Sequence, residues 1–271
     1  IRINPDVDPQ THPYIATGLQ ENKFGIAVND AGTVFEMATR MKNIRVTGVA
    51  CHIGSQLTEI KPFVDALEKM LDFVDQLLHL GITVDHLDLG GGLGIRYHHE
   101  APPNPNGYTR ALIEVLERRG CHLPVIIEPG RAIAGNAGVL LTRVEYLKQS
   151  DHRNFAVVDA GMSDLLRPAL YQGFHDILPA EQRAASKPRV YDVVGPVCES
   201  ADFLGKDRTL SIAEGDLLVL RSAGAYGFAM SSNYNSRTRA VEVIVDQDSF
   251  HIVRQRETLD QLMQNECLFP G

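Results

Sequence analysis

The first half of the chain alternates short apolar runs with amphipathic helical patterns. Apolar side chains recur at helical spacing over residues 63–78 and the pattern stops at Gly81, which predicts a helix that ends there. Further helices are predicted over residues 30–42, with Asp30 as the N-cap, and over residues 108–119. Strands are predicted at residues 1–4, 46–51, 86–89 and 125–127. Strands that alternate with helices indicate a parallel sheet with right-handed crossovers.

Each predicted helix has an apolar face that is expected to pack inward. These faces consist of Val34, Met37, Ala38 and Met41; of Phe63, Leu67, Met70, Leu71, Val74, Leu77 and Leu78; and of Leu112, Val115 and Leu116.

After about residue 135 the pattern becomes that of a β protein. Short β-branched or alternating segments occupy residues 139–147, 155–159, 191–194, 216–220, 240–245 and 249–254, and a helix is predicted only at residues 258–264. We therefore expect two domains: an α/β domain at residues 1–133 and a mostly antiparallel β domain at residues 134–271. A complete (β/α)8 barrel needs eight strands in about 250 residues. The four strands of the first domain predict the C-terminal half of such a barrel.

The first predicted strand begins at the first residue, Ile1. We therefore expect that an N-terminal segment is missing from the chain. A barrel strand left unpaired in this way would expose an edge and core surface, so these residues alone are expected to be unstable or to aggregate.

Composition narrows the class of protein. The 271 residues are 44% hydrophobic and 22% charged, as in an ordinary globular protein, and the formal net charge of −8 argues against nucleic acid or an anionic membrane as the main partner. No apolar run approaches the roughly 18–20 residues of a membrane helix. The four cysteines are widely spread, which fits a reducing compartment, so a cytoplasmic location is expected.

Small or ionisable residues follow three of the predicted strands. Chemistry in α/β barrels is placed at the carboxyl ends of parallel strands, so these three segments predict one shared site. Charge at a strand end is costly to bury without a partner, and glycine lets a ligand approach the backbone. The residues are His52, Gly54 and Ser55; Gly90, Gly91 and Gly92; and Glu128, Gly130 and Arg131.

Each segment alone also has a structural explanation. A lone strand-end histidine is more often a structural hydrogen-bonding residue, and three glycines are usually a tight turn. The combination favours a site. Cys51, Cys121 and Cys267 are expected to be structural, and the loop at residues 98–100 is interpreted as solvated, with no metal site predicted.

Ten short motifs, in this order, carry a resemblance that covers essentially the whole chain. They lie at residues 2–6, 18–25, 52–56, 89–92, 128–131, 159–162, 167–171, 195–200, 224–227 and 231–237. The chain resembles the alanine-racemase-like, fold-type III pyridoxal-phosphate enzymes, and among them the diaminopimelate decarboxylase family. The resemblance implies decarboxylation of meso-2,6-diaminopimelate to L-lysine and CO2, with pyridoxal 5'-phosphate as the cofactor.

The resemblance also implies residue roles around the cofactor. Gly90, Gly91, Gly92 and Gly130 would offer backbone N–H groups to the phosphate, with hydroxyl donors from Ser55 and Tyr226. Glu128 would pair with the pyridine nitrogen, which helps the ring to act as an electron sink. His52 would stack on the ring.

On the substrate side, arginine is the natural partner of a carboxylate. The resemblance implies that Arg131, which also lies beside the cofactor, and Arg167 bind carboxylate, with Tyr171 and Tyr226 beside them. Glu199 would bind the distal ammonium group, and Cys198 would act as a general acid. The loop at residues 195–200 reaches the other subunit's active site in proteins of this kind, which implies a homodimer with shared sites.

The resemblance fails at one position. The family's Schiff-base lysine belongs to a first barrel strand that this sequence does not contain, and none of the seven lysines lies in a matching segment. The chain as given is therefore expected to be catalytically incomplete.

Three alternatives stay open. The chain could be a related decarboxylase acting on ornithine, arginine or carboxynorspermidine, although Arg167 and Glu199 favour diaminopimelate. A non-catalytic, decarboxylase-like regulator is permitted by the missing lysine, but Cys198, Glu128 and Arg131 argue against it. An alanine-racemase-like activity is the least favoured.

Overall fold

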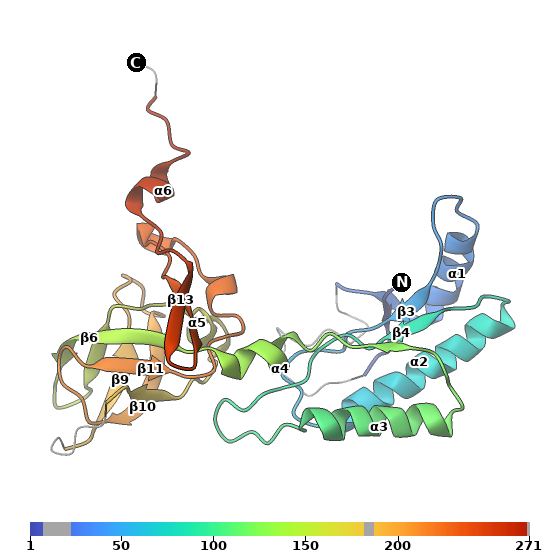
Figure 1. Cartoon of the computed structure of the whole chain (residues 1–271), viewed down its shortest axis with the longest axis horizontal. Coiled ribbons are helices and arrows are strands. Elements are labelled where there is room, and N and C mark those ends of the chain that lie inside the picture. Colours follow the sequence, from blue (N-terminus) through green and yellow to red (C-terminus); the bar gives the residue numbers. More distant parts are fainter. Residues whose placement is uncertain (8–22, 182–186, 270–271) are drawn as a thin grey trace. The chain divides into compact units, whose positions relative to one another are not determined.

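The computed structural model describes residues 1–7, 23–181 and 187–269, which form two compact units, Ile1–Ile133 and Ala134–Gly271 (Figure 1). Each unit has its own hydrophobic core. The motif at residues 18–25 begins outside the described residues.

The first unit is built on parallel strands. β3 (Gly48–Ala50), β4 (His86–Asp88) and β5 (Val125–Ile126) pair in that order, and β1 (Ile3–Asn4) pairs with β2 (Ile26–Ala27). A bridge between Arg2 and Ala50 places β1 beside β3, and the Ala50 amide donates to the Ile1 carbonyl over 2.9 Å. The prediction of four strands was wrong by one. β2 runs directly into the following helix, and its last residue, Ala27, is an N-cap without a side-chain hydrogen bond, so no capping signal separates the strand from the helix.

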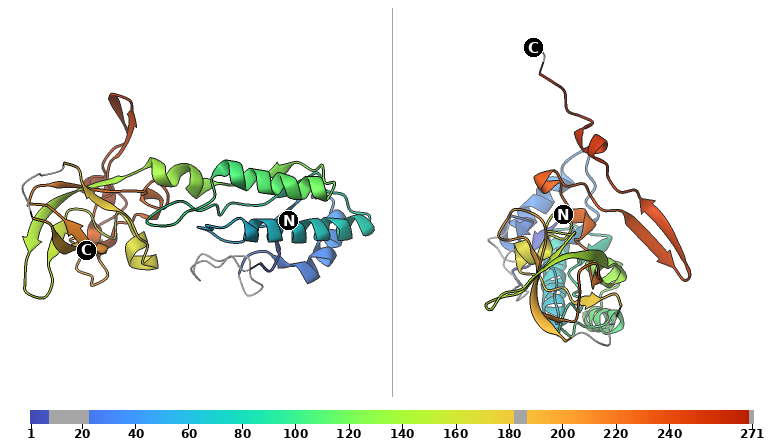
Figure 2. Two further views of the ribbon diagram at one scale, coloured as in Figure 1. Left: turned by 90° about the horizontal axis from the view of Figure 1, so that it is seen from below. Right: turned by 90° about the vertical axis from the view of Figure 1, so that its left-hand side faces the viewer.

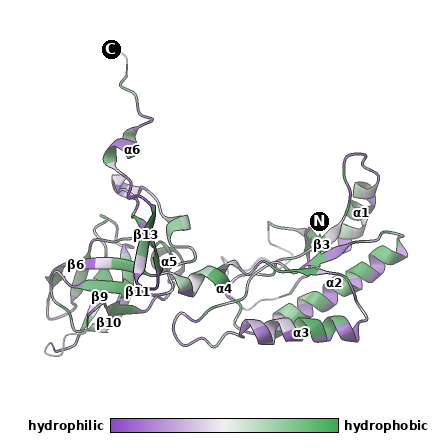
Figure 3. Cartoon of the chain, viewed as in Figure 1, coloured by the Kyte–Doolittle hydropathy of each residue, from purple (hydrophilic) through white to green (hydrophobic). Residues whose placement is uncertain are grey.

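Three helices cover this sheet: α1 (Val28–Thr39), α2 (Lys61–His79) and α3 (Pro105–Arg118). α2 buries eight side chains along one face, from Phe63 to Leu77. Hydrophobic and hydrophilic residues alternate along its ribbon (Figure 3). Gly81, with φ of +75°, follows its end as predicted. Leu78, expected to face inward, is instead 52% exposed.

The first helix differs most from its prediction. Strand β2 runs directly into α1, so Ala27 is the N-cap and Asp30 lies inside the first turn. The buried face is Ala31, Phe35 and Ala38, whereas the predicted Met37 and Met41 are exposed. Phe35 sets this orientation by packing edge-on against Phe73 of α2, with ring centroids 5.4 Å apart.

The second unit contains a six-stranded sheet in the order β10-β9-β7-β6-β11-β8. Only β7 and β9 pair in parallel; the other neighbours are antiparallel. The edge strands β8 and β10 contact each other, so the sheet nearly closes around its core. The strands are β6 (Leu140–Lys148), β7 (Phe155–Val158), β8 (Ile177–Pro179), β9 (Arg189–Val194), β10 (Phe203–Leu210) and β11 (Leu217–Leu220).

Strands β8 and β10 were not predicted. β10 carries two register shifts against β9, which break the alternation of apolar and polar side chains that would have revealed it. β8 has three residues.

A separate hairpin, β12 (Glu242–Asp246) and β13 (Ser249–Arg254), projects from the six-stranded sheet (Figure 2). Its apolar side chains are largely exposed, with Val245 at 72% and Phe250 at 71%. The last helix, α6 (Leu259–Met263), begins with a capping box between Thr258 and Gln261. Within the described ranges, no helix is long and apolar enough to cross a membrane.

Candidate functional site

The predicted site residues of the first unit meet where strands β3, β4 and β5 end. The glycine run after β4 lies between the other two strand ends. A Cβ atom on Gly90 would fall 2.5 Å from the Cys51 carbonyl oxygen, and one on Gly91 would fall 2.2 Å from that of Glu128. A Cβ atom on Gly92 would fall 2.4 Å from the Gly54 carbonyl oxygen. The three glycines thus allow three strand ends to approach one another.

His52 is half-buried beside this glycine run. Its Nδ1 accepts a hydrogen bond from the Gly91 amide over 3.0 Å, which leaves the ring hydrogen of the neutral side chain on Nε2. Burial and the nearby Arg2 guanidinium lower the pKa of His52, against an opposing effect of Asp88. The geometry therefore favours a neutral, fixed imidazole ring.

The Glu128 segment is tied to the same glycines. The Glu128 amide donates to the Gly90 carbonyl over 2.8 Å, and the Gly90 amide donates to Asp88 Oδ1 over 2.9 Å. The Glu128 side chain is exposed. Gly130 begins the short helix α4 (Gly130–Ala134), and a Cβ atom there would meet nothing within 4 Å.

Arg131 is the buried cation of this cluster, with 7% of its surface exposed. Its Nη2 donates to Ser55 Oγ over 2.9 Å, and its Nη1 donates to the Tyr97 hydroxyl over 2.6 Å. Two predicted site residues, Arg131 and Ser55, are therefore in direct contact. Tyr97, which sequence analysis did not select, holds the guanidinium from a third segment.

In the second unit, the Cys198–Glu199 segment forms an exposed turn after β9. Asp202, which is only 4% exposed, holds this turn together through two hydrogen bonds. Its Oδ2 accepts from the Val197 amide over 2.7 Å, and its backbone amide donates to the Glu199 carbonyl over 3.0 Å. Asp202 Oδ1 also accepts from the Met162 amide over 2.6 Å. Burial raises the pKa of Asp202, although the hydrogen bonds from the Met162 and Val197 amides act to lower it.

Arg167 and Tyr171 are the first and last residues of the short helix α5 (Arg167–Tyr171). Arg167 is 8% exposed, and its Nη1 lies 2.8 Å from Nε2 of the fully buried His175. Tyr226 lies on a third segment and is 41% exposed with φ of +59°, a left-handed conformation that is uncommon for an aromatic residue. The predicted residues of this unit thus occupy three separate segments.

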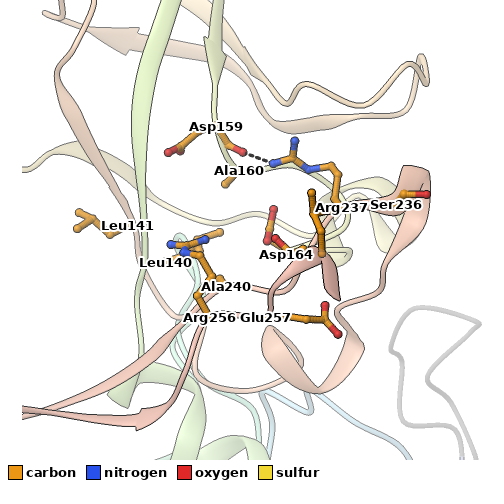
Figure 4. Close-up of a pocket in the computed structure, with 12 residues that line it drawn as sticks. Leu140, Leu141, Asp159, Ala160, Asp164, Ser236, Arg237, Ala240, Arg256 and Glu257 are labelled. Carbon is orange, nitrogen blue, oxygen red and sulfur yellow. Dashed lines mark hydrogen bonds between the residues drawn. The ribbon is translucent and has the colours of Figure 1, made fainter. Parts of the chain in front are cut away.

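A cavity of about 480 Å³ in the second unit is lined by the first residues of β6 and by Asp159 and Ala160, which follow β7 (Figure 4). Arg237 lines this cavity and donates from Nη2 to the Asp159 backbone carbonyl over 2.6 Å. Asp164 lines the same cavity, and burial raises its pKa. These residues belong to or follow motifs at residues 159–162 and 231–237, but sequence analysis gave none of them a role.

Tyr97, Asp202 and His175 were not predicted from the sequence. Tyr97 and Asp202 contact residues 34 and 40 positions away. His175, although only eight residues from Arg167, is fixed by the Arg221 carbonyl 46 positions away. Contacts of this kind leave no local sequence pattern. At residues 98–100, Glu100 Oε2 accepts from the amides of Tyr97 and His98, so the carboxylate organises the loop. Across the described parts of the chain, no group of three or more metal-ligating side chains gathers.

Comparison with known proteins gives consistent results. Residues 1–135 match the family model of the pyridoxal-dependent decarboxylase, pyridoxal binding domain. The diaminopimelate decarboxylases of Pseudomonas aeruginosa and Vibrio cholerae are 58% and 55% identical over 270 residues, which is all of this chain and 64% of each relative. A crystal structure of diaminopimelate decarboxylase from Helicobacter pylori complexed with L-lysine matches with a TM-score of 0.91 and 40% identity, covering 97% of this chain and 65% of that one.

The chain thus spans slightly less than two thirds of the length of these relatives. Because sequence identity extends over its full length and both kinds of comparison agree with the family model, the chain belongs to the fold-type III pyridoxal-dependent decarboxylase family.

Proposed function

We propose that the protein decarboxylates meso-2,6-diaminopimelate to L-lysine and CO2 with pyridoxal 5'-phosphate. The observation that carries this proposal is the 58% identity, over the whole chain, to a diaminopimelate decarboxylase. The Helicobacter pylori relative, complexed with L-lysine, supports the product.

The donor set of the first unit fits the cofactor. An exposed carboxylate on Glu128 can accept the N–H of a pyridinium ring, and a neutral, fixed imidazole at His52 offers a flat face for stacking. The open space at Gly130, the Ser55 hydroxyl and the buried Arg131 suit the phosphate and the acidic groups beside it. When bound, the cofactor would supply the electron sink for the bond that breaks.

The second unit would recognise and protonate the substrate. Arg167 and Arg131 would bind the distal carboxylate, with Tyr171 and Tyr226 as further substrate-binding residues, and the exposed Glu199 would bind the distal ammonium group. As the C–C bond breaks and CO2 leaves, the Cys198 Sγ–H would donate a proton to the carbon atom that carried the departing carboxylate. The exposure of the Cys198–Glu199 turn supports access to a ligand.

We further propose that the first unit is part of a (β/α)8 barrel. The five parallel strands of this unit and the helices that cover them support this assignment. The active enzyme would be a homodimer with shared sites, formed with the turn at residues 195–200. A cytoplasmic location is supported by the four free thiols.

The test is to incubate the full-length protein with pyridoxal phosphate and meso-diaminopimelate and to measure L-lysine and CO2. Borohydride reduction followed by intact mass should show one cofactor bound per chain. Absence of lysine from a cofactor-loaded protein would refute the proposed activity.

Substrate choice is tested separately with ornithine and arginine as competing substrates. Arg167→Ala should lower kcat/KM for diaminopimelate by at least about tenfold, because a charged hydrogen bond is lost. Arg143→Ala is the matched control, since this side chain is 58% exposed and pairs only loosely with Glu145, at 4.0 Å. Faster turnover of ornithine than of diaminopimelate would favour the related decarboxylases instead.

A further inference from the structure

Arg167 lies at the start of α5 with almost all of its side chain buried. A long arginine side chain can adopt many conformations, so it can bind a carboxylate in a fixed direction only if something orients its guanidinium. The contact of Arg167 Nη1 with His175 Nε2, at 2.8 Å, is a candidate for that orienting interaction.

The hydrogen-bond partners of His175 determine which tautomer it adopts. Its Nδ1 lies 2.9 Å from the Arg221 backbone carbonyl, which can only accept, so Nδ1 carries the hydrogen. Nε2 then has a lone pair, and the guanidinium, which can only donate, supplies the N–H. A single neutral tautomer satisfies both contacts.

The chain after α5 folds back to hold this pair in place. Gln172 adopts a left-handed conformation at the C-cap, and the Gly173 amide donates to the Arg167 carbonyl over 3.1 Å. A Cβ atom on Gly173 would lie only 3.4 Å from Arg167 Cζ, so the segment passes close to the guanidinium. Arg208 Nη2 donates to the His175 carbonyl over 3.1 Å, which fixes the backbone of His175 from β10.

The choice of a neutral acceptor has a chemical consequence. A carboxylate in the place of His175 would orient Arg167 but would also neutralise its charge. The neutral imidazole orients the guanidinium without placing a negative charge beside it.

We propose that His175 is a positioning residue that orients Arg167 toward the carboxylate of the substrate, and so helps to select amino acids that carry a distal carboxylate. The inference rests on the proposed function, because it takes Arg167 as a substrate-binding residue. It assigns a role to a buried histidine that does not itself touch the substrate.

The test compares two ligands that differ only in a carboxylate group, L-lysine and cadaverine. Their dissociation constants are measured by calorimetry on the cofactor-loaded, full-length protein. In His175→Phe the ring shape remains but the acceptor is lost, so L-lysine should bind at least about tenfold more weakly. Cadaverine, which has no carboxylate for Arg167 to bind, should bind as it does to the wild-type protein.

A second variant covers the case in which the first fails to fold. In His175→Gln the side-chain carbonyl can still accept from the guanidinium, so the loss of L-lysine affinity should be smaller and cadaverine binding should again be unchanged. His251→Phe, at an exposed histidine on β13, is the matched control and should alter neither ligand.

The outcomes separate this inference from the proposed function. If the wild-type protein neither decarboxylates diaminopimelate nor binds L-lysine, the proposed function fails. If it does both, and Arg167→Ala weakens L-lysine binding while His175→Phe does not, the inference alone is overturned. Equal losses for L-lysine and cadaverine in the His175 variants would also overturn it, because they would show a general structural role.

Discussion

Replacing Gly91 by alanine should break the contact on which the first unit's site depends. The added Cβ atom would fall 2.2 Å from the Glu128 carbonyl oxygen and 3.2 Å from its carbon. Ordinary contacts begin at 3.4 Å, so the carbonyl would have to retreat by about 1.2 Å. The obstacle is backbone, which cannot move aside as a flexible side chain can.

The expected cost follows from two terms. Overpacking of this kind costs about 1–3 kcal/mol. Separating the strand ends also weakens the hydrogen bond from the Glu128 amide to the Gly90 carbonyl, now 2.8 Å, at a cost of roughly 1 kcal/mol. Gly91→Ala should therefore destabilise the first unit by about 2–4 kcal/mol, a large part of a typical domain's stability.

Urea unfolding followed by circular dichroism at the helix band measures this, because the three long helices α1, α2 and α3 all belong to the first unit. The control is Gly130→Ala, where the Cβ atom meets nothing and stability should stay equal or rise by up to about 1 kcal/mol. In that variant only pyridoxal-phosphate affinity should fall, if the open space at Gly130 serves the cofactor. Equal unfolding midpoints for Gly91→Ala and the wild-type protein would refute the packing argument.

Three further predictions concern the same groups. Burial lowers the pKa of His52 below 6.5, so as pH falls through 6.5 the unfolded chain binds a proton before the folded protein does. The free energy of unfolding should therefore fall by up to about 1.4 kcal/mol per pH unit, and urea titrations over this range should show a shallower pH dependence for His52→Phe. Tyr97→Phe removes a hydrogen bond to a buried cation and should cost about 1.5–3 kcal/mol in the same unfolding assay, and an unchanged midpoint would contradict this. If sites are shared in a dimer, mixing the inactive Arg131→Ala and Cys198→Ala proteins should restore up to about a quarter of wild-type activity, whereas no recovery after subunit exchange would argue for separate sites.

Much of the first unit was predictable because its helices are strongly amphipathic. The apolar pattern of α2 located the helix within two residues at each end, and Gly81 marked its termination. The orientation of α1 was not predictable from its own sequence, since the packing of Phe35 on Phe73 decides which face is buried. Strand β2 was missed because no capping residue separates it from α1, and β8 because it includes Pro179, which argues against a strand in a sequence.

The candidate site was also predictable only in part from the sequence. Motifs at strand ends were visible because a parallel sheet places consecutive strand ends together, and the structure brings His52, the glycines, Glu128 and Arg131 into one cluster. Supporting residues were not visible, because their contacts link distant segments: Tyr97 is 34 residues from Arg131, and Asp202 is 40 residues from Met162. Such contacts have no local sequence pattern.

The glycines at both sites are best explained by backbone packing. The amides of Gly90 and Gly91 already donate to Asp88 and His52. Glycine is required at both positions because a Cβ atom would fall within 2.5 Å of a carbonyl oxygen on a neighbouring strand end, with or without a bound ligand. The second unit uses the same arrangement around Asp202, where a Cβ atom on Gly195 would fall 2.4 Å from its carboxylate and one on Gly161 would fall 3.0 Å away. In both units, residues without side chains allow a polar group to be held against backbone amides beside the proposed site residues. Replacing these glycines would therefore disturb folding before it disturbed binding, and only positions with open space, such as Gly130, can report on a ligand alone.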